Sequence, residues 1–158
     1  MNISIILAAG EGTRMKSDIP KVLHKICGKP MLEYVIDNSK EAGIDKNYII
    51  IGHGGQKVKD AFSHKDVVFK DQPIGPQYPY GTGFAVMQAK EHIEDDSNVV
   101  ILCGDTPLIT SKTIGELIQY HIGNKNFGTV LTAYVEDPTG YGRIIRDEEG
   151  NIEKIVEH

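Results

Sequence analysis

The chain has 158 residues, of which 40% are hydrophobic and 25% charged, and its formal net charge is −5 at pH 7. This length suits one domain with an appreciable core, and the excess of acids argues against a nucleic-acid surface. The opening apolar run is too short for a membrane span and lacks the features of a signal peptide. Cys27 and Cys103 stand in no metal-type spacing, so we expect reduced thiols in a cytoplasmic protein that binds no membrane.

The first apolar run, Ile3 to Leu7, predicts a strand that is buried on both faces. It leads into a bend containing Gly10 and Gly12, which lack a Cβ and allow backbone N–H groups to approach a ligand. A glycine bend of this kind, opening towards a helix, is typical of a phosphate site. The alternative is a tight turn that simply needs glycine.

Two basic residues, Arg14 and Lys21, follow this bend closely. Fixed positive charge lowers the barrier of nucleotidyl transfer by stabilising negative charge on phosphate oxygens. The bend fits neither common phosphate loop, because Met15 occupies the third glycine position of the dinucleotide fingerprint and no Walker sequence is present. Arg14 and Lys21 are therefore candidates for binding a triphosphate, with solvated surface charges as the alternative.

The remaining chain alternates between helical and strand patterns. We predict helices over residues 30–42, 57–62, 82–92 and 111–122, strands over 48–51, 67–69, 98–102 and 129–135, and a hairpin from 142–146 and 152–158. Three prolines within residues 72–80 predict a partly rigid loop. The alternation indicates an α/β fold, a Rossmann-like doubly wound and mainly parallel sheet, with ligands beyond the carboxyl ends of its strands.

Asp105 follows the strand predicted at residues 98–102. Its carboxylate would reach the same edge of the sheet as the glycine bend, and it is a hard oxygen ligand suited to Mg²⁺ beside phosphate oxygens. The alternative is an Asx-turn or a helix cap.

Several motifs together resemble the sugar-phosphate nucleotidyltransferase family. The first are Leu7 to Met15 and Pro20 to Leu23. Later matches follow in the same order at residues 28–31, 81–83, 104–108, 137–144 and 155–158. The resemblance extends over nearly the whole chain and is strongest to the members that transfer a uridylyl group to N-acetylglucosamine 1-phosphate. It implies the fold of the nucleotide-diphospho-sugar transferases.

The resemblance also implies roles for individual residues. Mg²⁺ would bind Asp105, Arg14 and Lys21 would be catalytic, and Gly142 and Glu157 would hold the sugar. The nucleotide would contact Leu7, Ala8, Ala9, Gly10, Gly12, Thr13, Arg14, Lys21, Gln72, Gly81 and Thr82.

Two departures from the family pattern concern base recognition. The loop between Gln72 and Gly81 is longer than in the family, which makes Gln77 a rival to Gln72 for reading uracil. Phe84 stands where the family has a histidine.

The implied reaction joins UTP and N-acetylglucosamine 1-phosphate to give UDP-N-acetylglucosamine, a peptidoglycan precursor, and pyrophosphate. We expect residues 1–158 to form one nucleotidyltransferase domain, holding the nucleotide-binding half and the start of the sugar-binding half. In the family this domain continues with two asparagines for sugar and metal, and a further C-terminal domain makes trimers. The sheet would then be truncated on its C-terminal side, and the sequence leaves open whether the chain turns over alone. A sister transferase with another base or sugar and a non-catalytic nucleotide-binding module remain alternatives.

Overall fold

The computed structural model describes residues 1–12, 15–79 and 81–156. The chain divides into two compact units, Met1–Phe127 and Gly128–His158. Across the described residues, no helix combines the length and the apolar character needed to cross a bilayer.

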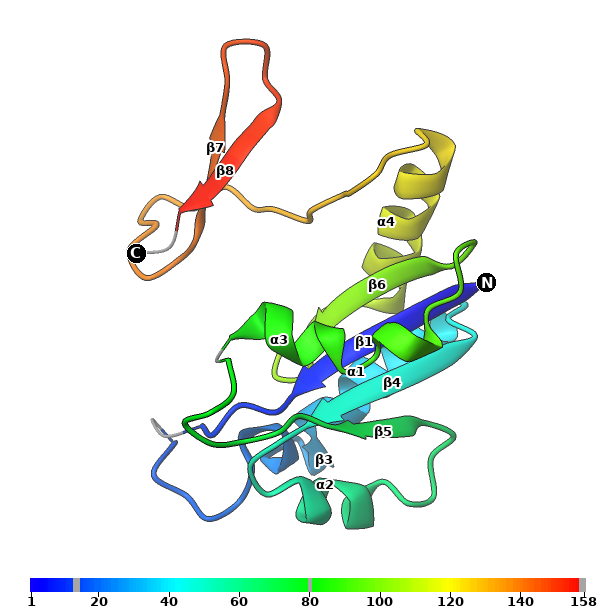
Figure 1. The fold of residues 1–158 in the computed structure, drawn as a ribbon, viewed down its shortest axis with the longest axis vertical. Helices are drawn as coiled ribbons and strands as arrows, with labels where there is room; N and C mark the ends of the chain where they lie inside the picture. Colours follow the sequence, from blue (N-terminus) through cyan, green and yellow to red (C-terminus); the bar gives the residue numbers. More distant parts are fainter. Residues whose placement is uncertain (13–14, 80, 157–158) are drawn as a thin grey trace. The chain divides into compact units, whose positions relative to one another are not determined.

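The first unit is built on a four-stranded sheet, shown in Figure 1. Its strands are β1 (Asn2–Ala8), β4 (Lys46–Ile51), β5 (Val68–Asp71) and β6 (Asn98–Cys103), in the order β5-β4-β1-β6. All three pairings are parallel, with Ile5 of β1 opposite Tyr48 on one side and Ile101 on the other. Because the chain adds β4 and β5 on one side of β1 and then β6 on the other, the strand order switches between β1 and β6. The predicted doubly wound, parallel fold is confirmed.

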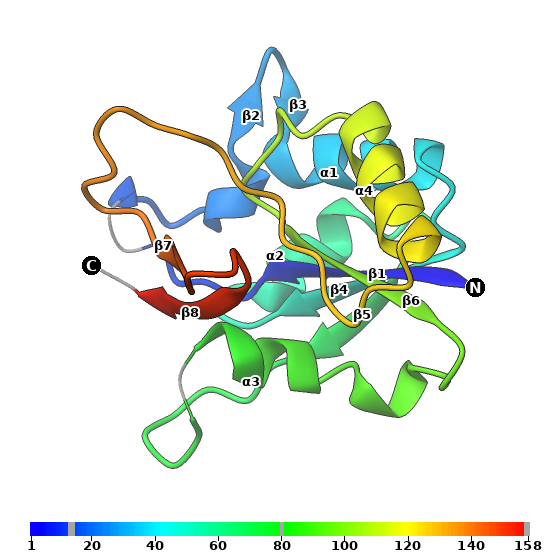
Figure 2. The ribbon, with the colours of Figure 1, turned by 90° about the horizontal axis from the view of Figure 1, so that it is seen from above.

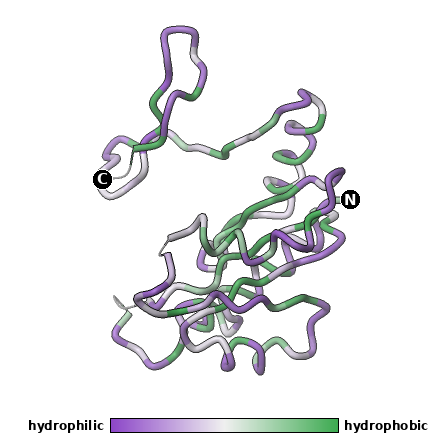
Figure 3. The backbone as a smooth tube through the Cα atoms, viewed as in Figure 1, coloured by the Kyte–Doolittle hydropathy of each residue, from purple (hydrophilic) through white to green (hydrophobic). Residues whose placement is uncertain are grey.

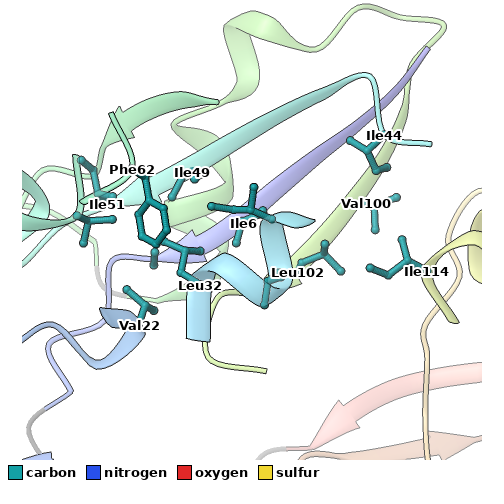
Figure 4. Packing of buried hydrophobic residues seen from close by; sticks show 14 of the residues in the cluster. Ile6, Val22, Leu32, Ile44, Ile49, Ile51, Phe62, Val100, Leu102 and Ile114 are labelled. Atoms are coloured by element: carbon teal, nitrogen blue, oxygen red, sulfur yellow. The ribbon is translucent and has the colours of Figure 1, made fainter. Parts of the chain in front are cut away.

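Three helices cover one face of this sheet: α1 (Met31–Glu41), α2 (Gly55–Ala61) and α4 (Ser111–Gly123). In α1, Leu32, Val35 and Ile36 are buried at helical spacing and pack against strand residues such as Ile6 and Ile49. Figure 4 shows this packing at close range, and Figure 3 shows that the apolar stretches follow the strands whereas the polar ones follow the outer turns.

The opposite face is covered by α3 (Thr82–Met87), as Figure 2 shows. Ala85 and the following Ala89 pack on Ile3, Ile5 and Ile50. The prediction of one continuous helix over residues 82–92 is wrong. After Met87 the hydrogen bonds shorten to three-residue spacing, and the chain makes a separate 3-10 turn, η3 (Lys90–His92).

A buried polar cluster links β1, α1 and β4 within this unit. Asn47 Oδ1 accepts hydrogen bonds from the hydroxyl groups of Ser4 and Ser39, each at 2.6 Å. All three residues are buried. The two donors satisfy the amide oxygen where water cannot reach it.

Sequence reasoning missed a short segment ahead of α1. The 3-10 turn η2 (Lys21–Leu23) leads into a hairpin of β2 (Lys25–Ile26) and β3 (Lys29–Pro30). Cys27 and Gly28 at its tip have φ angles of 50° and 83°. Positive φ at both central residues matches the right-handed twist of the flanking strands.

The second unit contains one antiparallel hairpin, β7 (Arg143–Arg146) and β8 (Ile152–Val156), which confirms the predicted one. The side-chain amide of Asn151 donates to Asp147 across the turn, and this bond, with backbone hydrogen bonds from Asn151 and Glu149, lowers the pKa of the Asp147 carboxyl group. The strand predicted at residues 129–135 is wrong, since that segment forms no strand and exposes Leu131 and Tyr134. Local β-propensity does not make a strand without a hydrogen-bonded ladder.

Candidate functional site

The glycine bend follows directly from the carboxyl end of β1. Gly12 has φ +62°, and the backbone N–H of Met15 donates to its carbonyl at 2.8 Å. A Cβ on Gly12 would lie 3.1 Å from Lys21 Cβ, whereas a Cβ on Gly10 would meet no atom of the described residues within 4 Å. Gly12 thus lets the bend pack tightly against Lys21, and Gly10 leaves open space for a ligand.

Two neighbouring segments hold the backbone that leads to Lys21. The side chain of Pro20 fills the space beside Gly54, where a Cβ would lie only 2.8 Å from Pro20 Cγ. Lys57 of α2 donates to the carbonyl of Asp18 at 2.7 Å. Lys21 therefore starts from a fixed backbone position, although its own side chain keeps four rotatable bonds.

Asp105 is brought to the bend by a close approach of β6 to β1. The N–H of Gly104 donates to the carbonyl of Leu7 at 2.9 Å, and a Cβ on Gly104 would lie 2.9 Å from that same oxygen. Only glycine therefore fits without moving one strand end away from the other. The result is an ion pair in which Lys21 Nζ lies 2.6 Å from Asp105 Oδ2.

The opposite wall of the site begins at the end of β5. The N–H of Gln72 donates to the carbonyl of Ile51 at 2.7 Å and so extends the pairing of β5 with β4. Gln77 turns back on the loop, because its side-chain oxygen lies only 2.6 Å from the position that a Cβ on Gly75 would occupy. Gly75 has φ +141°, which glycine adopts readily. The two glutamines therefore lie in different surroundings.

An aromatic pair holds this loop against the start of α3. The rings of Tyr78 and Phe84 stack with centroids 6.3 Å apart and an interplanar angle of 20°. Gly81, at the N-terminus of α3, has φ +128°. Phe84, which departs from the family pattern, thus packs against a residue of the longer loop.

These segments surround one cavity of about 1070 Å³, large enough for a nucleoside triphosphate. Every predicted nucleotide or metal residue that the structure describes lines it: Leu7, Ala8, Ala9, Gly10, Gly12, Lys21, Gln72, Gly81, Thr82 and Asp105. Gln77 is not among the lining residues. Thr13, Arg14 and Glu157 lie outside the described residues, and Gly142 belongs to the second unit, next to β7.

Sequence reasoning did not single out three further lining residues: His53, Tyr78 and Cys103. His53 and Cys103 lie at the carboxyl ends of β4 and β6, so the rule that ligands bind at strand ends could have indicated both. Desolvation and the neighbouring Asp105 carboxylate raise the pKa of the Cys103 thiol. That thiol is therefore protonated at neutral pH and is a poor metal ligand.

A divalent cation fits the donor set at Asp105. No cluster of three or more His, Cys, Asp or Glu side chains that could hold a metal occurs among residues 1–12, 15–79 and 81–156. Mg²⁺ commonly needs only one or two carboxylates when phosphate oxygens and water complete its shell. Asp105 beside the glycine bend supplies one such carboxylate.

The doubly wound sheet with a glycine bend, a lysine and an aspartate at its switch point is an arrangement suited to a nucleotidyltransferase. Comparison with known proteins agrees. The chain belongs to the MobA-like NTP transferase domain family, whose model matches residues 4–144.

The curated relatives include proteins called bifunctional protein GlmU. The one from Clostridioides difficile is 50% identical over 154 residues, and the one from Thermoanaerobacter pseudethanolicus is 49% identical over 155 residues. These alignments cover 98% of this chain but only 32% and 33% of the relatives. The chain thus spans about a third of their length.

Solved structures share the fold. HddC from Yersinia pseudotuberculosis superimposes with a TM-score of 0.72 at 25% identity, over 99% of this chain and 69% of its own. A nucleotidyl transferase from Methanothermobacter thermautotroptrophicus gives a TM-score of 0.65 at 21% identity, over 76% of this chain and 57% of its own.

Proposed function

We propose that the chain transfers a uridylyl group from UTP to N-acetylglucosamine 1-phosphate, giving UDP-N-acetylglucosamine and pyrophosphate. The observation that carries the proposal is the meeting of the glycine bend, Lys21 and Asp105 around one cavity. Identity of about 50% to the GlmU proteins over 98% of the chain supports a sugar-phosphate nucleotidyltransferase, and the motif resemblance is the basis for proposing this base and sugar.

Nucleotidyl transfer requires stabilisation of negative charge on the phosphates rather than a covalent enzyme intermediate. A phosphate oxygen of the sugar phosphate bonds to the α-phosphorus of UTP while the bond to the pyrophosphate oxygen breaks. Backbone N–H groups of the bend and the Lys21 ammonium would stabilise the negative charge on the phosphates. We propose Arg14, from the same bend, for the same task.

A divalent metal, Mg²⁺ in our proposal, would be held by Asp105 and would neutralise charge on the phosphate oxygens when bound. A structural neighbour of the same fold, Rv0371C from Mycobacterium tuberculosis, was crystallised with manganese (TM-score 0.58, 21% identity). The proposal rests on the residues of this chain, because the Asp105 carboxylate lies next to the proposed phosphate position.

For base recognition we propose the side-chain amide of Gln72 and the backbone at Gly81 and Thr82. An amide offers both a donor and an acceptor, which can match the imide edge of uracil. Gln72 lines the cavity, while the side chain of Gln77 packs on Gly75, and this favours Gln72. For the sugar we propose Gly142 and Glu157, within one nucleotidyltransferase domain that comprises residues 1–158.

The test is release of pyrophosphate from UTP, N-acetylglucosamine 1-phosphate and Mg²⁺ by the whole chain. We expect release that Asp105→Asn and Lys21→Met each reduce by 100-fold or so, on the order of the loss when one charge-stabilising group is removed. Asp71→Asn is the matched control, because Asp71 also ends a parallel strand of this sheet but lies outside the cavity. Normal turnover in either site variant would reject the assigned roles.

A sister transferase is the second candidate, favoured by the HddC structure crystallised in complex with GMP-PN. Comparing UTP, dTTP, CTP and GTP by thermal shift separates the two, because a ligand that binds the native state raises its stability with the logarithm of its concentration over Kd. Binding of UTP without any pyrophosphate release would instead indicate a non-catalytic nucleotide-binding module.

A further inference from the structure

The ion pair between Lys21 and Asp105 occupies one of the two carboxylate oxygens that a metal could bind. Lys21 Nζ lies 2.6 Å from Asp105 Oδ2, and the two side chains are 38% and 34% exposed. Mg²⁺ binds carboxylate oxygen at about 2.0–2.1 Å. An ammonium and a divalent cation at such distances from one oxygen would repel each other strongly, so the two compete for Asp105.

The surroundings of Lys21 allow its side chain to move away from Asp105. Both side chains line the cavity, and the lysine backbone is fixed by its packing against Gly12 and by the contact of Pro20 with Gly54. Only the flexible lysine side chain has to move, and a triphosphate in the cavity would offer it a new anionic partner. The carboxylate would then be free for the metal.

We propose that Lys21 acts as an internal counter-ion of Asp105, which a metal-bound triphosphate displaces. This inference rests on the proposed nucleotide site. Lys21 weakens binding of a metal alone, because the metal must first displace the ammonium. It strengthens binding of the metal–triphosphate complex, because the displaced ammonium then pairs with phosphate. The metal therefore enters with the nucleotide rather than before it.

The proposal makes two predictions of opposite sign for one substitution. Lys21→Met keeps most of the side-chain length and removes the charge, so it should tighten binding of Mn²⁺ alone and weaken binding of the triphosphate. The pair is partly exposed, so its release should raise the affinity for the metal by about two- to fivefold. A lysine that merely binds phosphate would weaken triphosphate binding without altering the affinity for Mn²⁺.

The experiment measures free Mn²⁺ by electron paramagnetic resonance during titration of the whole chain, first without nucleotide and then with UTP. A protein-free titration of UTP gives the Mn²⁺ that UTP binds by itself, which is subtracted. Lys21→Arg retains the charge and should bind Mn²⁺ alone no more tightly than the wild type. Lys59→Met is the matched control, because Lys59 forms a similar ion pair with Asp71 (2.9 Å) outside the cavity. Urea unfolding of each variant reports whether it is folded.

Tighter Mn²⁺ binding in Lys21→Met, but not in Lys21→Arg or Lys59→Met, would support the counter-ion role. Equal Mn²⁺ affinity in wild type and Lys21→Met would overturn it, while leaving the proposed function intact if UTP still promotes Mn²⁺ binding. Failure of UTP to promote Mn²⁺ binding in the wild type would instead overturn the proposed function, and the inference with it.

Discussion

Replacing Gly104 by alanine should separate the two halves of the proposed phosphate site. The new Cβ would lie 2.9 Å from the carbonyl oxygen of Leu7, 3.2 Å from Leu32 Cδ1 and 3.3 Å from Val22 Cγ1. The nearest atom is backbone, so the end of β6 must move away from β1 by about half an ångström to restore contact distances near 3.5 Å. Overpacking of this kind costs about 1–3 kcal/mol.

The same displacement carries Asp105 away from the glycine bend, so we expect weaker Mg²⁺-dependent binding of UTP as well as lower stability. At this chain length, about 1–3 kcal/mol corresponds to a fall in Tm of roughly 2–12 °C. Differential scanning calorimetry gives Tm, and isothermal titration calorimetry gives the affinity for UTP.

A matched control for this substitution is Gly115→Ala. Gly115 lies within α4, and its Cβ would meet nothing within 4 Å. Alanine there should stabilise the helix by about 0.5–1 kcal/mol and leave UTP binding unchanged. If Gly104→Ala binds UTP and unfolds like the wild type, the close approach of the two strands does not position Asp105.

Two further predictions concern the scaffold. Asn47→Ala leaves the buried hydroxyl groups of Ser4 and Ser39 without their acceptor, so we expect a loss of about 2–5 kcal/mol in urea unfolding, and an unchanged midpoint would contradict this network. Burial alone would raise the pKa of Asp37, but hydrogen bonds from Lys29 and Lys65 outweigh it and hold the pKa below the ordinary 3.8. A carboxyl group whose pKa is lower in the folded state than in the unfolded state stabilises the fold at pH values above its unfolded pKa. This stabilisation is lost as the pH falls through the folded-state pKa. The stability difference between wild type and Lys65→Met should therefore shrink below about pH 4, and a constant difference would count against the ion pairs.

The sheet could be predicted because the sequence pattern within each strand indicates a buried strand. Runs such as Ile3 to Leu7 are apolar on both faces, and helices of adequate length separate them, which favours parallel pairing. The 129–135 segment shows the limit of this reasoning. It has strand-forming residues, yet pairing depends on a neighbouring strand that local sequence does not specify.

The grouping of the candidate residues was predictable where chemistry and topology coincide. Gly10, Gly12 and Asp105 stand just beyond strand ends in the sequence, Lys21 follows the glycine bend, and the fold brings all four to one cavity. Which of these side chains contact each other was not predictable. That Lys21 contacts Asp105, 84 positions later, depends on the close approach at Gly104, which no spacing pattern encodes.

The most direct test of the central claim is the Mg²⁺ dependence of UTP binding, measured by isothermal titration calorimetry. If the glycine bend and Asp105 bind one metal–polyphosphate complex, Mg²⁺ should strengthen UTP binding to the wild type and to Asp71→Asn, and this effect should be lost in Asp105→Asn. An equal Mg²⁺ effect in Asp105→Asn would show that the metal binds elsewhere and would contradict the account.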